Sequence, residues 1–120
     1  MVNEATHRKL VDVRGLNVSY GEKPALRDLN IDARKGEILG VIGPANSGKT
    51  TFLKSINRTI DFIPGAKVTG AIEVDGQDVT RIRGGQLHQL RRKIGMVFPL
   101  PVGLPLTIYD NVAYAPRMAG

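Results

Sequence analysis

Residues 43–50 carry the pattern G-x-x-x-x-G-K-[S/T], which restricts how this chain can fold more than any other feature. The pattern forms a phosphate-binding loop when a strand precedes it and a helix follows it. Glycines let backbone N–H groups turn inward around an anion, and the following helix adds the positive end of its dipole. In such a loop Lys49 reaches the β- and γ-phosphates, and the Thr50 hydroxyl ligates Mg²⁺.

The residues on either side of the loop supply the expected context. Residues 37–42 form a short apolar run, which predicts a buried parallel strand. Residues 51–56 continue as a predicted helix with apolar side chains at positions 52, 53 and 56. The alternative is a chance glycine turn that contains a lysine, and the strand before it and the helix after it disfavour that interpretation.

The rest of the chain alternates between strand and helix signals. Imperfect apolar alternation predicts strands at 10–20 and 25–31, with a turn at 21–24. Further expected elements are a strand at 68–74 closed by Asp75-Gly76, a helix at 86–91, a strand at 94–98 and a helix begun by a Thr107/Asp110 capping box. The sequence therefore predicts an α/β fold: an incomplete P-loop nucleotide-binding core with an antiparallel β subdomain.

Charge and composition leave two interpretations open. The net charge is +6, and the densest basic set is Arg81, Arg83, Arg91, Arg92 and Lys93. A basic chain can bind nucleic acid, but aromatic residues make up only 5% and none lies among these cations, so we expect a solvated basic face. The sequence has no cysteine, no signal-peptide pattern at its start and no apolar run of membrane-spanning length.

Taken together, these motifs resemble the ATPase subunit of ATP-binding cassette (ABC) transporters. The likeness runs from Leu10 to Gly120 and covers about the first half of such a domain, so residues 1–120 are interpreted as its N-terminal portion. Within that superfamily the chain is most similar to phosphate-import ATPases. The segments that carry this finer likeness are 55–58, 63–66, 95–98 and 108–114.

The resemblance implies binding of ATP with Mg²⁺, with Thr50 as the metal ligand. It also places an aromatic residue, Tyr20, against adenine, whereas the alternative is a strand-end aromatic on a half-buried sheet. The expected binding residues are Tyr20, Gly43, Pro44, Ala45, Asn46, Ser47, Gly48, Lys49, Thr50 and Thr51.

Three positions depart from the family pattern or imitate it. Asn46 replaces a glycine, and Asn is the residue besides glycine that best tolerates positive φ. Pro99 stands where the family has a glutamine that contacts Mg²⁺ and the attacking water, and proline offers no polar side-chain atom. Gly84-Gly85-Gln86 imitates part of the family signature but precedes the glutamine position, so we interpret it as a glycine turn.

The resemblance also implies partners. These are a second ATPase subunit, as a homodimer, and transmembrane permease subunits, which place the protein in the cytoplasm at the inner face of the cell membrane. No nucleic acid is expected. The general base, the signature motif and the switch histidine do not occur in the 120 residues, so we expect ATP binding without hydrolysis and an unstable or self-associating chain.

Three alternatives remain at this point. A GTPase or kinase-like P-loop enzyme is disfavoured by the early antiparallel strands and the lack of an Asn-Lys-x-Asp motif. A basic nucleic-acid-binding P-loop protein would show salt-dependent DNA binding. A shortened gene product with a structural or regulatory role is the third, and an ABC-type ATPase for another substrate stays open within the favoured family.

Overall fold

The computed structural model describes residues 8–44, 47–97 and 103–119. Its centre is a four-stranded antiparallel sheet with strand order β2-β1-β3-β4. The strands are β1 (Lys9–Tyr20), β2 (Lys23–Arg34), β3 (Ala66–Val74) and β4 (Gln77–Asp78). The helices are α2 (Lys49–Ile56), the 3-10 helix η1 (Thr59–Phe62), α3 (Gly85–Lys93) and α4 (Ile108–Ala119).

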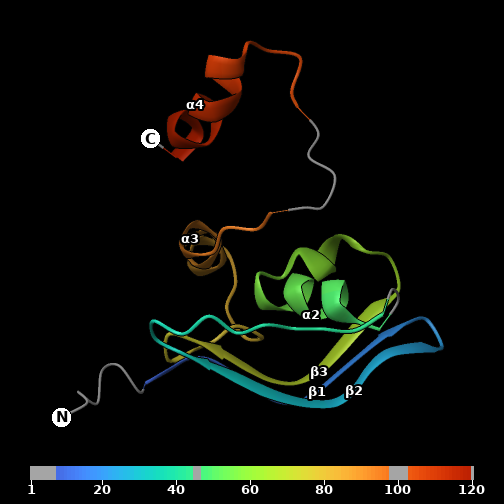
Figure 1. Ribbon diagram of the computed structural model, residues 1–120. Coiled ribbons are helices and arrows are strands. Elements are labelled where there is room, and N and C mark those ends of the chain that lie inside the picture. Colours follow the sequence, from blue (N-terminus) through green and yellow to red (C-terminus); the bar gives the residue numbers. More distant parts are fainter. Residues whose placement is uncertain (1–7, 45–46, 98–102, 120) are drawn as a thin grey trace.

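The helices lie on one side of the sheet, with α2 and η1 directly above it and α4 farthest away (Figure 1). This arrangement confirms the predicted α/β class with an antiparallel β layer. The predicted helices at 51–56 and 86–91 and the predicted strands at 10–20, 25–31 and 68–74 are all present, with small differences at their ends.

A β-bulge explains why the apolar alternation in β1 is imperfect. Val13 pairs with Ile31 and Leu16 pairs with Leu29, so β1 advances three residues where β2 advances two. The same extra residue appears against β3. Gly15, at the bulge, has a φ of 58°, a conformation that glycine adopts without steric cost. The bulge turns Leu16 and Val18 to the same face as Val13, and all three are buried.

The core lies between this face of the sheet and the helices above it. Val13, Leu16 and Val18 of β1 form its floor with Ile72 and Val74 of β3. Phe52, Ile60, Val79, Ile82 and Leu90 close it from above. At about 25 cal/mol per Å² of apolar surface removed from water, burial of each of these side chains contributes on the order of 1.5–3 kcal/mol. The core therefore fixes α2, and with it the phosphate-loop motif, to the sheet.

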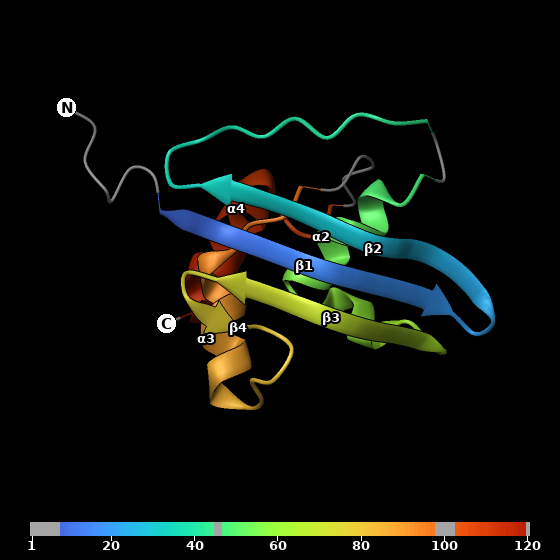
Figure 2. The same cartoon turned by 90° about the horizontal axis from the view of Figure 1, so that it is seen from below.

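The predicted buried strand at 37–42 is wrong. These residues form no strand, and Ile38 and Ile42 are each 98% exposed. The segment runs back beside β2 at the edge of the sheet and ends at α2 (Figure 2). No hydrogen bond joins the main chain of 38–42 to any described residue. An apolar run is not enough to form a strand, because a strand also needs a partner for its backbone N–H and C=O groups.

The end of the chain gives a second correction and one confirmation. Residues 94–97 of the predicted strand 94–98 have no regular structure, and Phe98 lies outside the described residues. Helix α4 begins as expected, because the backbone N–H of Asp110 donates to Thr107 Oγ1 at 3.0 Å. The carboxylate of Asp110 pairs with Arg117 at 2.9 Å instead of completing a capping box.

Candidate functional site

Gly48 fixes the start of α2 and thereby the shape of the phosphate loop. It is the N-cap residue, with φ 96° and ψ 4° in the left-handed region. A Cβ at this position would lie 2.6 Å from Leu26 Cδ2 and 3.1 Å from the carbonyl oxygen of Ala25. Glycine is therefore required here by both conformation and space. The close approach holds the first turn of α2 against the start of β2.

The loop before α2 is closed by its own contacts. The backbone N–H of Ser47 donates to the carbonyl of Pro44 at 3.2 Å. A Cβ on Gly43 would lie 2.7 Å from Ser47 Oγ, so this glycine also permits a close approach. The Lys49 side chain turns back across the loop, and its ammonium donates to the carbonyl of Gly43. The structure thus places the lysine charge over the loop, as the motif requires.

The first turn of α2 is electropositive. It contains no acidic residue. The first hydrogen bond within the helix is from Phe52 N–H to the carbonyl of Gly48, at 2.9 Å. The N–H groups of residues 49–51 have no hydrogen-bond partner among the described residues, as expected at a helix N-terminus. With the half-buried Lys49 beside them, these groups can accept an anion.

A cavity of about 590 Å³ opens directly onto this turn. Its volume lies within the range of sites that hold small molecules. The lining residues are Tyr20, Lys23, Pro24, Ala25, Ser47, Gly48, Lys49, Thr50 and Thr51. An aromatic residue therefore lines the same cavity as a cation and the first turn of a helix.

Tyr20 is connected to the phosphate-loop helix by a direct hydrogen bond. Its hydroxyl lies 2.9 Å from Thr51 Oγ1, across a sequence separation of 31 residues. The tyrosine is half-buried at the end of β1. The structure therefore brings Tyr20 to the same cavity as Lys49, Thr50 and Thr51.

The other predicted positions fall into two groups. Gly43 and Pro44 shape the loop without lining the cavity. Ala45, Asn46 and Pro99 lie outside the described residues. Thr50 is exposed at the cavity, where its hydroxyl can serve as one ligand of a metal ion. Within the described part of the chain, no three His, Cys, Asp or Glu side chains gather as a metal site.

Sequence reasoning missed three residues that line the cavity: Lys23, Pro24 and Ala25. They were assigned to a turn or to an ordinary strand. The pairing register places them, because Lys23 is the β2 partner of Tyr20. A prediction of the exact hairpin register would have identified them, because residues paired directly across two strands lie in the same surroundings.

Two motifs are explained as structural. Gly84 is the N-cap of α3 with a φ of 59°, so the predicted glycine turn is confined to Gly84, and Gly85 and Gln86 begin the helix. The basic set at 81–93 is only partly a solvated face. Arg81 pairs with Asp78 at 3.4 Å, and the half-buried Arg91 donates to backbone carbonyls.

No helix among the described residues combines the length and apolar character needed to cross a membrane.

The sequence model of the family described as ABC transporter matches residues 26–118, which is most of the chain. That match contains the phosphate loop and α2, and it begins just after the other lining residues of the cavity, Tyr20, Lys23, Pro24 and Ala25. The chain therefore belongs to the ABC transporter family, as an ATP-binding subunit.

Proposed function

We propose that this chain binds Mg·ATP in the cavity between Tyr20 and the first turn of α2. The observation that carries the proposal is the cavity itself. It joins an aromatic side chain from β1 to a half-buried lysine and to helix N–H groups that have no partner among the described residues. A nucleoside triphosphate has a flat base that matches the aromatic side chain and a polyanion that matches the lysine and the helix N-terminus.

Each lining residue has a role in this proposal. The ring of Tyr20 stacks on adenine. Lys49 leaves the Gly43 carbonyl and pairs with the β- and γ-phosphates, and the residues of the loop from Gly43 to Thr51 surround them. The Thr50 hydroxyl would serve as one ligand of Mg²⁺, which would neutralise phosphate charge.

Calorimetric titration with Mg·ATP tests the phosphate end. Lys49→Ala removes a charge-assisted contact and is expected to weaken binding about tenfold or more. Lys54→Ala is the matched control, because Lys54 lies on the last turn of the same helix and does not line the cavity. Equal weakening by both substitutions would contradict the proposed site.

Comparison of ATP with inorganic triphosphate tests the base end. Tyr20→Ala is expected to weaken ATP by about 1–3 kcal/mol, the usual value of one base–aromatic stack, and to leave triphosphate unchanged. Tyr20→Phe keeps the ring and loses only the hydrogen bond to Thr51. A loss of triphosphate affinity in Tyr20→Ala would mean that the tyrosine supports the loop and does not contact the base.

We propose further that residues 1–120 are the N-terminal portion of an ABC ATPase domain that serves an importer of phosphate or a related oxyanion. The support is the likeness of segments 55–58, 63–66, 95–98 and 108–114 to phosphate-import ATPases. In this proposal two such subunits pair, bind permease subunits and work at the cytoplasmic face of the membrane, while these 120 residues alone bind ATP without turning it over. Deletion of the gene should abolish uptake of radiolabelled phosphate. Normal phosphate uptake with loss of another substrate would assign a different cargo.

A second candidate function, binding of nucleic acid, is favoured by the net charge of +6. Two of the five cations in its densest basic segment are engaged with other described residues, which weakens it. A filter-binding titration with duplex DNA at several salt concentrations tests it, because phosphate contacts make affinity fall steeply with salt. Tight, salt-dependent binding that survives Lys49→Ala would favour the second function.

A further inference from the structure

The far end of α2 is held as firmly as the end at the phosphate loop. The C-cap residue, Asn57, is 7% exposed. Its side-chain oxygen accepts hydrogen bonds from the N–H of Thr59 at 3.1 Å and from Thr59 Oγ1 at 2.8 Å. Its amide nitrogen lies 3.5 Å from the sulfur of Met96. Both halves of the amide are therefore used, and one half reaches the segment that follows α3.

Arg91 of α3 caps the carbonyl end of α2. Its Nε donates to the carbonyl of Asn57 at 3.2 Å, and its terminal nitrogen donates to the carbonyl of Arg58 at 3.1 Å. The guanidinium also lies over the ring of Phe62, 5.2 Å from the centroid. A cation at this end of a helix interacts favourably with the negative end of its dipole. Arg91 thus joins α3 to the end of α2 through two donors of one rigid group.

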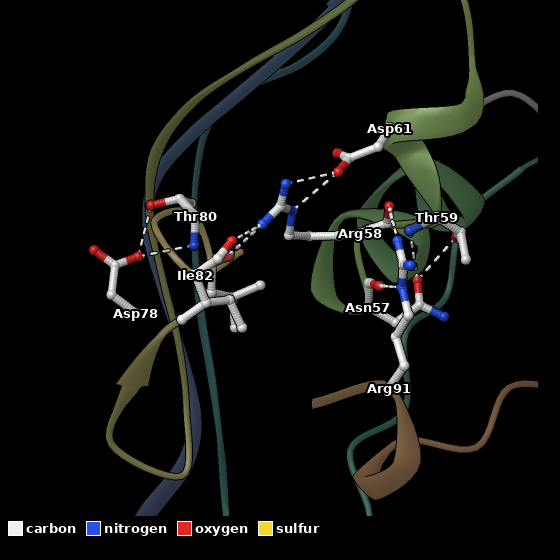
Figure 3. A network of polar contacts seen from close by, with 9 residues as sticks. Asn57, Arg58, Thr59, Asp61, Asp78, Thr80, Ile82 and Arg91 are labelled. Atoms are coloured by element: carbon white, nitrogen blue, oxygen red, sulfur yellow. Dashed lines mark hydrogen bonds and ion pairs between the residues drawn. The ribbon is translucent and has the colours of Figure 1, made fainter. Parts of the chain in front are cut away.

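Arg58 makes the reverse connection. It donates to Asp61 Oδ2 at 2.8 and 3.1 Å, and also to the carbonyls of Ile82 and, at 3.5 Å, Val79, which lie on the segment that leads into α3. Figure 3 shows Arg58 extending from the end of α2 towards Ile82, and Arg91 extending from α3 towards Asn57. The Arg58 side chain is only 17% exposed, so these contacts are screened little by solvent.

This reciprocal joint has a mechanical consequence. An eight-residue helix is about 12 Å long and behaves as a rigid rod, with the phosphate loop at one end and Arg91 at the other. A displacement of α2 on binding phosphate therefore reaches Asn57, and through Arg91 and Met96 it reaches α3 and residues 94–97. Apart from this joint, α3 is connected to α2 through the shared core, to which Leu90 and Phe52 belong.

We propose that Arg91 is a positioning residue that transmits nucleotide binding at α2 to α3 and to residues 94–97. The inference rests on the proposed function, since it assigns regulation to the same site. Arg91 touches neither the cavity nor its lining residues, so it acts only through α2. Two arginines bonded to backbone carbonyls in opposite directions form a connection that carries motion both ways.

Hydrogen exchange of the full chain with and without Mg·ATP tests the proposal. In the wild type we expect ATP to slow exchange in α2 and also in α3 by at least about fivefold, the lower range of measured couplings between sites. In Arg91→Gln the protection of α2 should remain and that of α3 should fall below about twofold. Arg92→Gln is the matched control, since Arg92 is exposed and makes no hydrogen bond or ion pair with the described residues.

The outcomes are distinguishable. No protection of α2 in the wild type would overturn the proposed nucleotide site itself. Protection of α2 without α3, or equal protection of α3 in wild type and Arg91→Gln, would overturn the role of Arg91 while leaving the nucleotide site intact. Strand β1 is the internal reference, because stabilisation by mass action alone would protect it as much as α3.

A second variant guards against a folding defect. Arg91→Lys keeps the charge but cannot donate to both carbonyls from one planar group. If Arg91→Gln unfolds, Arg91→Lys is expected to transmit protection to α3 less than half as well as the wild type at about the same melting temperature. Full transmission in Arg91→Lys would overturn the proposed geometry, since charge alone would then be sufficient.

Discussion

The β1–β2 hairpin and the segment 37–42 are close in sequence and similarly apolar, yet they have opposite environments. Leu16 of β1 is 0% exposed, whereas Ile42 is 98% exposed. The hairpin strands find each other across a two-residue turn and then bury their face under α2. Parallel strands need a crossover of a dozen or more residues before they meet. An apolar pattern therefore indicates which side chains of a segment can be buried, and whether they are buried depends on whether a partner strand is available to pair with the segment.

The largest expected effect comes from removing side chains from the two regions in turn. Leu16→Ala leaves a cavity in the core and is expected to lower the free energy of unfolding by about 2–5 kcal/mol. Ile42→Ala removes a side chain that already faces solvent and is expected to change it by less than about 0.5 kcal/mol. Urea denaturation of the two variants measures both values. Similar losses would mean that residues 37–42 are buried in solution.

Gly48 and Gly36 both have positive φ, but only Gly48 packs closely against a strand, so they compare a crowded position at the cavity with an open one. Gly48→Ala forces a Cβ against Leu26 and Ala25, at 2.6 and 3.1 Å, while a Cβ on Gly36 meets nothing within 4 Å. Both substitutions carry the left-handed strain of about 1–2 kcal/mol. We expect only Gly48→Ala to weaken the binding of Mg·ATP as well, by about tenfold, because the added Cβ moves the phosphate loop away from β2. Titration calorimetry and thermal unfolding separate the two effects.

If Gly36→Ala weakened nucleotide binding as much as Gly48→Ala, the crowding at β2 would not be the cause. The turn at residues 35–36 would then act on the loop through the segment 37–42.

Exposure of 37–42 also predicts association. The main chain of 38–42 has no hydrogen bond to a described residue, and Ile38 and Ile42 face solvent, which favours edge pairing with another chain. We expect sedimentation velocity to show larger species as concentration rises, and Ile38→Lys with Ile42→Lys to reduce them. Gln86→Lys with Gln89→Lys on α3 adds the same charge at exposed positions and is the control. Equal reduction by both pairs would assign the effect to charge repulsion.

Elements fixed by local signals could be predicted from the sequence. The phosphate loop, α2, the hairpin and the Thr107 cap each depend on residues within a few positions of one another. Even the irregular alternation of β1 was visible, although its cause, a bulge at Gly15, was not. The placing of Tyr20 beside Lys49 came from the family resemblance, since no local rule joins residues so far apart.

What could not be predicted depends on long-range geometry. Lys23 lines the cavity because of the strand register, and Arg91 caps α2 because α3 packs beside it. Arg91 was assigned to a solvated basic face, since a run of cations gives no sign of which one turns inward. The prediction of a strand at 37–42 was wrong for the same reason, because the sequence of a segment does not show which other segment it pairs with.

The smallest expected effect is a pH dependence within the sheet region. Asp78 of β4 accepts hydrogen bonds from Thr80 Oγ1 at 2.6 Å and from its N–H at 2.9 Å. The Thr80 hydroxyl holds the pKa of Asp78 below its usual value, against a smaller opposing effect of desolvation. Because the pKa is lowered in the folded state, the carboxylate contributes stability above the unfolded pKa of about 3.9 and loses it as pH falls. Thr80→Val should therefore flatten the fall in stability between about pH 5 and about pH 2. Urea denaturation of wild type and Thr80→Val across this range measures the difference. An unchanged slope would mean that the Thr80 hydroxyl is not the main cause, and that the Thr80 backbone N–H and the charges of Arg81 and Arg14 lower the pKa of Asp78.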